Sequence, residues 1–189
     1  MKELAKKLIR MLCGDYSIYY IYSRSQEDLP ATSEKTTTFS VKGIDAIAIK
    51  SSSDLLIRKQ VGYTGADTHA YACFDDDRIV GVCFYWFGNR YLERNFWSLA
   101  DKEAKLVQII SLPDMRGRGV ATLLVSSSFQ DMMRQGFHRV YARIWHSNIP
   151  SLRAFERAGW ARIALVFEIN PLRQKNPIRV YFNYKNRAI

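Results

Sequence analysis

The sequence has few cysteines and no long apolar run. Its three cysteines, Cys13, Cys73 and Cys83, include no CxxC pair and no Cys/His spacing typical of a metal site. Their odd number and their scatter predict buried free thiols in a reducing compartment rather than a disulfide framework. No stretch approaches the roughly 20 apolar residues of a membrane-spanning helix, and residues 1–12 carry charges throughout, unlike a secretory signal. We therefore expect a cytoplasmic protein with no transmembrane segment and no metal ligands.

Two common nucleotide-binding patterns are also missing. Gly117-x-Gly119 is followed by Thr122 at the position where a dinucleotide-binding fingerprint has its third glycine. No Gly-Lys-Ser/Thr follows either, as it would in a phosphate-binding loop of nucleotide hydrolases. These absences disfavour a dehydrogenase and a nucleotide-triphosphate hydrolase.

What is present is an ordinary globular composition with a strongly basic second half. The 189 residues are 48% hydrophobic and 24% charged, which predicts a single domain over residues 1–189. Residues 2–12 have the spacing of an amphipathic basic helix, which would dock on the protein's own core or contact a membrane surface. The net charge is +10. Most of the excess lies in residues 134–189, which contain eleven Lys and Arg but only two Glu. Such a field attracts nucleic acid, anionic lipid or a phosphorylated small molecule.

The pattern of apolar residues predicts alternating strands and helices. Asp75-Asp76-Asp77 has the composition of a hairpin turn between two strands, and Gly136 and Gly159 are typical helix stops. We predict strands over 16–22, 41–49, 70–74, 79–87, 105–112, 140–145, 160–169 and 178–184, and helices over 54–61, 118–135 and 151–158. This order implies a mixed sheet with helices packed on its faces.

The turn between the strand at 105–112 and the helix at 118–135 is a candidate anion site. Gly117 and Gly119 let the backbone bend tightly and approach a ligand closely. The first N–H groups of the helix have no internal partner, and the helix dipole adds positive charge there. Arg116 and Arg118 add formal charge. The turn therefore suits a phosphate or diphosphate group.

Two motifs in order resemble one enzyme superfamily. Arg116-x-x-Gly119-x-Ala121 fits the Arg/Gln-x-x-Gly-x-Gly/Ala turn of the GCN5-related N-acetyltransferase (GNAT) superfamily. The downstream segment from Asn148 to Trp160, Asn-x-x-Ser-x-x-x-Phe-x-x-x-Gly-Trp, resembles that superfamily's Asn-x-x-Ala-x-x-x-Tyr-x-x-x-Gly-Phe segment. The helix and strand between them have the expected lengths, and the resemblance covers residues 78–170.

The resemblance implies both a fold and an activity. The fold is of the α/β (α+β) class, with a mixed, mostly antiparallel central sheet flanked by helices and two splayed strands that hold the cofactor. The activity is transfer of an acetyl group from acetyl-coenzyme A (acetyl-CoA) to a primary amine of a small molecule or peptide, by direct attack in a ternary complex. The oligomeric state stays open.

The resemblance also assigns cofactor contacts by position. Strand residues 109–111 would hydrogen-bond the pantetheine arm, and the amides of 117–122 would bind the diphosphate. Asn148 would touch the pantetheine or thiol region, with helix capping as the alternative role. Phe155 would pack beside the acetyl group or simply in the core. The predicted cofactor-binding residues are Ile109, Ile110, Ser111, Arg116, Gly117, Arg118, Gly119, Val120, Ala121, Thr122, Asn148 and Phe155.

Two positions depart from the family pattern. A tyrosine that serves as general acid in many members is replaced by Phe155, and a glutamate base of some members by Arg143. We name His146 and Glu103 as candidates for proton transfer. The alternative for His146 is a structural or exposed histidine, and the alternative for Glu103 is a solvated carboxylate in a turn. Because the usual acid and base are absent, a CoA-binding regulatory module is an alternative function, and the basic half leaves a nucleic-acid-binding protein as another.

Aromatic residues gather before the cofactor strand. They belong either to the sheet core or to the wall of an acceptor pocket. They are Phe84, Tyr85, Trp86, Phe87, Tyr91, Phe96 and Trp97.

Overall fold

The computed structural model describes residues 15–28, 38–170 and 177–184. The strands there are β1 (Asp15–Ser25), β2 (Phe39–Ile44), β3 (Thr68–Asp75), β4 (Arg78–Trp86), β5 (Glu103–Ser111), β6 (Arg139–Trp145), β7 (Ala161–Asn170) and β8 (Ile178–Asn183). The α-helices are α2 (Ala46–Lys50), α3 (Leu55–Arg58), α4 (Val120–Arg134) and α5 (Ile149–Arg157). Short 3-10 helices are η1 (Gln26–Asp28), η2 (Lys59–Tyr63), η3 (Arg90–Arg94) and η4 (Pro113–Met115).

The described strands form one sheet in the order β2-β3-β4-β5-β6-β1-β7-β8. Neighbouring strands are antiparallel except β5 and β6, which are parallel and are joined through α4. A parallel pair needs such a crossover, whereas β3 and β4 are joined by a tight hairpin in which Asp76 has a φ of 51°. The mixed, mostly antiparallel sheet flanked by helices agrees with the predicted fold.

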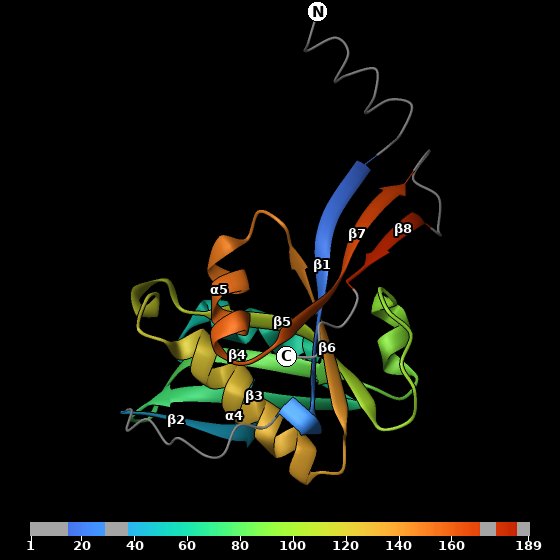
Figure 1. Cartoon of the computed structure of the whole chain (residues 1–189). Helices are drawn as coiled ribbons and strands as arrows, with labels where there is room; N and C mark the ends of the chain where they lie inside the picture. The colour runs from blue at the N-terminus through green and yellow to red at the C-terminus, as the bar shows by residue number, and fades with distance from the viewer. Residues whose placement is uncertain (1–14, 29–37, 171–176, 185–189) are drawn as a thin grey trace, which may run out of the picture.

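Helices cover both faces of the sheet. Ser128 of α4 contacts Cys83 and Tyr85 on one face of β4, whereas Tyr63 of η2 stacks on Phe84 from the other face at 5.4 Å between ring centroids. These assignments follow from the alternation of side chains along a strand. Figure 1 shows α4 and α5 in front of the sheet. The second face carries the η2 and η3 segments.

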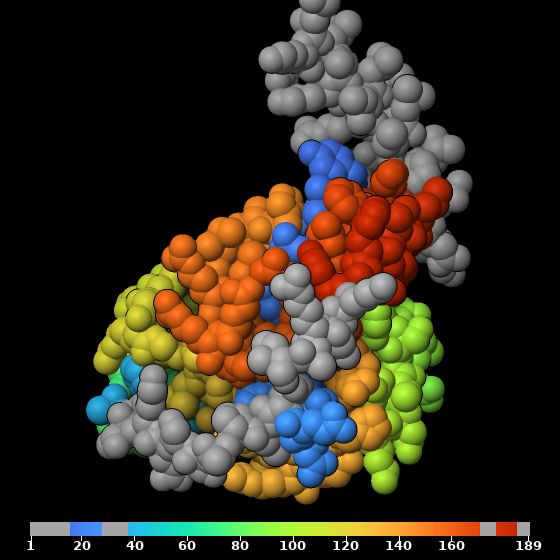
Figure 2. Space-filling view, viewed as in Figure 1, coloured from blue at the N-terminus to red at the C-terminus, as the bar shows by residue number. Residues whose placement is uncertain are grey.

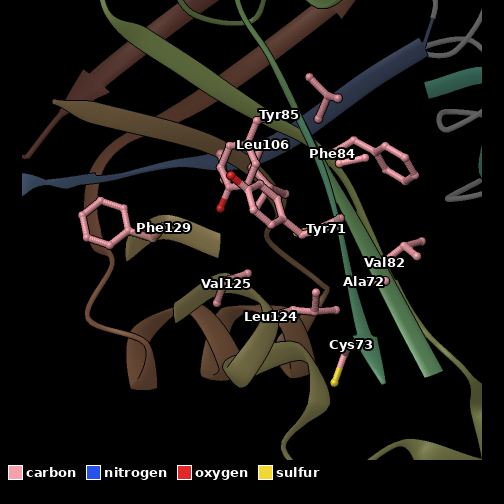
Figure 3. Packing of buried hydrophobic residues seen from close by; sticks show 14 of the residues in the cluster. Tyr71, Ala72, Cys73, Val82, Phe84, Tyr85, Leu106, Leu124, Val125 and Phe129 are labelled. Atoms are coloured by element: carbon pink, nitrogen blue, oxygen red, sulfur yellow. The ribbon is translucent and has the colours of Figure 1, made fainter. Parts of the chain in front are cut away.

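The main core lies between α4 and the strands β3, β4 and β5. Val125 and Phe129 come from one side of α4 because residues four apart share a helix face. They are fully buried, and Figure 3 shows them across from Tyr71 and Tyr85 of the sheet. This packing holds β5 and the start of α4 in a defined relation, which positions the turn between them.

The predicted elements differ from the structure mainly near residue 45. The expected strand over 41–49 is wrong in its second half, because β2 ends at Ile44 and Ala46–Lys50 is helical. Asp45 caps this helix by accepting a hydrogen bond from the Ala48 N–H at 2.8 Å. The predicted basic helix over 2–12 lies outside the described residues. In the part that is described, no helix has the length and apolar character needed to cross a membrane.

Candidate active site

The turn that follows β5 is exposed and shaped by two glycines. Leu112 and Met115 are buried and anchor it, while residues 116–119 are exposed. Gly117 and Gly119 have φ values of 79° and 86°, which disfavour residues with a side chain. A Cβ atom would meet nothing within 4 Å at either position, so conformation rather than space requires glycine there. In Figure 2 the yellow segment around this turn lies at the surface of the molecule.

The first turn of α4 presents free backbone donors at this place. The first hydrogen bond at its start runs from the Leu123 N–H to the Gly119 carbonyl at 2.9 Å. The N–H groups of Val120, Ala121 and Thr122 therefore have no acceptor within the helix. Together with the helix dipole they form a site suited to an anion.

The two arginines of the turn differ in their surroundings. Arg118 lies 3.7 Å from the Asp75 carboxylate and stacks on the Phe39 ring at 5.0 Å. Arg116 is exposed and forms no ion pair with a described residue. Arg116 is thus the cation of this turn that is free to meet a ligand.

A cleft opens where β5 and β6 separate. Their parallel pairing ends at Leu106 and Ala142, although both strands continue, and they point in different directions in Figure 1. The cleft between them has a volume of about 170 Å³. It is lined by Arg94, Phe96, Leu106, Val107, Gln108, Ile109, Ala142, Arg143, Ile144, Trp145, Asn148, Ser151 and Phe155. Beyond Leu106, the backbone groups of β5 that face β6 have no strand partner. A ligand can therefore form the hydrogen bonds that a paired strand would otherwise form.

A β-bulge lies at the mouth of this separation. In the pairing with β4, Phe84 faces Gln108 and Tyr85 faces Leu106, which leaves Val107 as the extra residue. The Arg94 guanidinium donates to the Val107 carbonyl at 3.1 Å and holds the bulge from the second face of the sheet.

The predicted cofactor residues fall in two places. Ile109, Asn148 and Phe155 line the cleft, whereas Ile110 and Ser111 continue along β5 toward the glycine turn. The Ser111 hydroxyl oxygen is buried and has no hydrogen-bond partner among the described residues. Such an orphaned group fits a bound ligand that supplies the missing hydrogen bond.

Asn148 and Phe155 each have the structural role that the sequence offered, and each also lines the cleft. The Asn148 side chain accepts a hydrogen bond from the Ser151 N–H at 3.3 Å and so caps α5, while it also lines the cleft. Phe155 is buried against Trp160 at 5.0 Å between ring centroids, and it forms part of the cleft wall.

The two candidates for proton transfer are not among the residues that line the cleft. His146 is exposed, and its Nδ1 lies 3.0 Å from the Ile18 carbonyl of β1, on the side of β6 away from β5. Glu103 is buried rather than solvated, and its two oxygens accept from the Tyr141 hydroxyl and the Ala100 N–H. The prediction of a solvated turn position for Glu103 as its alternative role is therefore wrong.

A larger hollow of about 590 Å³ lies next to Glu103 and Phe137. It is at the start of β5, whereas the glycine turn follows the end of that strand. The smaller cleft between β5 and β6 is therefore the better candidate for a ligand that also reaches the turn.

Lys105 is a functional candidate that the sequence reasoning missed. It is fully buried on β5, with its Nζ 4.3 Å from the centre of the Tyr91 ring and 3.3 Å from the Asn95 side-chain oxygen. Burial, and then the positive charges of Arg179 and Arg143, lower its pKa to about 7. A lysine next to the mostly apolar run Leu106–Ile110 was the available signal. Among the described residues no group of three or more His, Cys, Asp or Glu is arranged to hold a metal ion.

Comparison with known proteins identifies the family. The family model described as "Acetyltransferase (GNAT) family" matches residues 42–160, well over half of the chain. No curated protein sequence matches the chain significantly.

Solved structures share the fold. A GNAT-family protein from Novosphingobium aromaticivorans is 16% identical with a TM-score of 0.57, and the match covers 82% of this chain and 64% of that one. A GCN5-related N-acetyltransferase from Kribbella flavida is 15% identical with a TM-score of 0.53, covering 84% and 60%. One from Sphaerobacter thermophilus is 15% identical with a TM-score of 0.55, covering 87% and 56%. The chain thus spans under two thirds of the length of these proteins.

Proposed function

We propose, because this chain belongs to the GNAT acetyltransferase family, that it transfers an acetyl group from acetyl-CoA to a primary amine. The acceptor would be a small molecule or a peptide, and both substrates would be bound together. We place the reaction in the cytoplasm, in keeping with the scattered cysteines.

The observation that carries this proposal is the separation of β5 from β6 after Leu106 and Ala142. The open backbone edge of β5 and the orphaned Ser111 hydroxyl suit the amide-rich pantetheine arm. Residues 116–122 at the far end of the same edge suit the diphosphate. In this arrangement the thioester lies in the cleft, near Phe155 and Asn148.

The chemistry needs little from side chains. The amine nitrogen attacks the thioester carbonyl carbon, a C–N bond forms, and the C–S bond breaks to release CoA as a thiolate that takes up a proton. Positioning two reactants side by side supplies much of the rate. The extra residue of the bulge, Val107, offers a backbone N–H that would polarise the carbonyl oxygen.

Proton transfer in this proposal runs through water. Phe155 has no proton to give, and both oxygens of Glu103 are engaged within the protein. In the neutral His146 ring with its Nδ1 proton donated to the Ile18 carbonyl, Nε2 keeps a lone pair. In this proposal His146 acts as a base only through a water molecule that carries the proton from the amine to Nε2.

Two measurements test the proposal. Calorimetry with acetyl-CoA measures cofactor binding, and thiol release across a broad panel of primary amines measures turnover. We expect micromolar binding or tighter and release that depends on the amine. A protein that neither binds acetyl-CoA nor releases thiol with any amine would refute the proposal.

A CoA-responsive regulatory module is the second candidate, favoured by Phe155 at the position of the usual acid. It predicts cofactor binding without turnover, so any amine acetylated at a useful rate excludes it. A nucleic-acid-binding role gains less support, because Arg162 and Arg179 of the basic half each lie 2.6 Å from a glutamate. Binding titrations with DNA and RNA over a range of salt concentrations test that role.

A further inference from the structure

Arg143 lines the cleft where β5 and β6 first separate, and it is stacked among aromatic rings. It follows Ala142, the last β6 residue paired with β5, and it lines the cleft. Its guanidinium carbon is 5.1 Å from the centre of the Tyr19 ring, 5.2 Å from that of Trp145 and 5.5 Å from that of Phe96. These rings hold the guanidinium in place through its faces.

The hydrogen-bond donors of Arg143 meet no acceptor within residues 15–28, 38–170 and 177–184. Among the described residues no carboxylate lies within ion-pair distance of Arg143, and no hydrogen bond links it to another group. Glu168 is close enough for the charge of Arg143 to help lower its pKa. That carboxylate is already bound by Arg179 at 2.6 Å and by the Tyr19 hydroxyl at 3.1 Å. The N–H groups of Arg143 are therefore available to a ligand in the cleft.

Positive charge is crowded around this position. Arg94 also lines the cleft, and Lys105 shares the Phe96 ring with Arg143, at 4.8 Å from its centre. The charges of Arg143 and Arg179 lower the pKa of Lys105, so these two guanidinium groups act on Lys105 as neighbouring positive charges. A bound anion would relieve this repulsion.

The peptide segment over this group is held from β8. The Arg179 guanidinium donates to the Asn95 carbonyl at 2.8 Å, and the Lys105 ammonium approaches the side-chain oxygen of the same asparagine. Figure 2 shows β8 (red) and the η3 segment (green) next to each other at the surface. Hydrogen bonds to the Asn95 segment therefore hold Arg179 and Lys105 in place next to Arg143.

The phosphates of CoA do not account for this charge. In the proposed placement they bind at residues 116–122, beyond the end of β5, whereas Arg143 lies at the point where β5 and β6 first separate. The group that reaches Arg143 must come with the acceptor, because the thioester end of CoA is uncharged.

From this geometry we infer that the acceptor amine carries an oxyanion, a carboxylate or a phosphate, which Arg143 binds while the amine meets the thioester. A planar guanidinium matches both groups through two parallel hydrogen bonds. The inference rests on the proposed function and adds the substrate class.

The first test compares amines that differ only in the anion. Amino acids are paired with their amides, and phosphoethanolamine with ethanolamine, and kcat/KM for thiol release is measured for each. We expect the anionic member of a pair to be preferred by about tenfold or more, since hydrogen bonds to a charged group contribute at least that much. The two kinds of pair distinguish a carboxylate from a phosphate.

Arg143→Gln should remove this preference, mainly through a higher KM for the anionic amines. Arg153→Gln is the matched control, because Arg153 is exposed on α5 and does not line the cleft. Circular dichroism and the urea midpoint check that both variants fold. Equal kcat/KM within each pair, or a preference that survives in Arg143→Gln, would overturn the inference and leave acetyl transfer intact.

A binding measurement does not need turnover. Calorimetry in the presence of CoA compares N-acetylated amino acids and N-acetylphosphoethanolamine with their neutral counterparts. We expect the wild type to bind the anionic compounds, and we expect Arg143→Gln to bind them at least about tenfold more weakly. If CoA binds but no anionic compound does, the inference is wrong; if CoA itself does not bind, the proposed function fails first.

Discussion

Leu106 on β5 and Ala142 on β6 form the last pair of a parallel ladder in which both strands continue after pairing stops. β6 turns toward β1, with which it stays paired as far as Tyr19 and Trp145. β5 stays with β4 up to Ser111. Each strand therefore keeps one neighbour, and the gap between them exposes backbone that a ligand can pair with.

Filling this gap should block the cofactor. Ser151 is half-buried at the start of α5 and lines the cleft, so Ser151→Trp places an indole in a space of about 170 Å³. The helix cap uses the backbone N–H of Ser151 and is retained. We expect acetyl-CoA affinity to fall on the order of tenfold or more, as measured by calorimetry. Arg153→Trp on the exposed side of α5 is the control, and equal affinities in the two variants would contradict the placement.

The glycine turn can be tested with a pair of matched glycines. Gly119 precedes α4 and Gly136 follows it, and their φ values are 86° and 92°. A Cβ atom would meet nothing within 4 Å at either position. Alanine should cost each site about 1 to 2 kcal/mol of unfolding free energy, measured in urea. Only Gly119→Ala should also weaken CoA binding, because it disturbs the donors of Val120–Thr122. Similar CoA affinities in both variants would exclude a cofactor role for this helix start.

Lys105 should make the stability depend on pH. Its pKa falls from an ordinary 10.5 to about 7 in the folded chain, chiefly through burial and then through Arg179 and Arg143. Between these values the unfolded chain binds more protons, so the contribution of Lys105 to stability rises as the pH increases from about 7 to 10. At or below pH 7 the cost of its buried charge is fully present.

Lys105→Met should therefore be most stabilised relative to the wild type near pH 6, with the difference shrinking toward about pH 9. Urea unfolding of both proteins at these two pH values measures it. Lys50→Met, at an exposed lysine of α2, should show no such trend. A difference for Lys105→Met that is the same at both pH values would show that the ammonium is not disfavoured by its surroundings.

Ser128 supports a buried polar network under α4. Its Oγ lies 2.9 Å from the Tyr85 hydroxyl and accepts from the Cys83 thiol at 3.6 Å, and all three side chains are fully buried. Ser128→Ala should cost about 1 to 3 kcal/mol, because the Tyr85 hydroxyl then lacks this partner. Ser126→Ala on the half-buried side of α4 should cost less. In the double variant with Tyr85→Phe the cost should be less than additive, and strict additivity would show that the two hydroxyls do not interact.

Local signals predicted most elements correctly. The Asp75–Asp77 turn, the periodic run of α4 and its glycine stop all depend on residues close in the chain, and the structure confirms them. The prediction for the segment after Ile44 was wrong because the alternation of Ile47 and Ile49 is typical of a strand. In the structure, the cap at Asp45 starts a short helix instead. A short apolar run does not distinguish the two states.

The sequence by itself determined the family, the order of most elements and the glycine turn, since each depends on spacing along the chain. Only the tertiary structure decided what surrounds the cleft. Phe96, Arg143 and Arg179 come from different segments, and the charges of the two arginines act on Lys105 through space rather than along the chain. The same folding engaged both oxygens of Glu103 and turned His146 toward β1. Burial and charge proximity are properties of packing, so no local pattern could have predicted them.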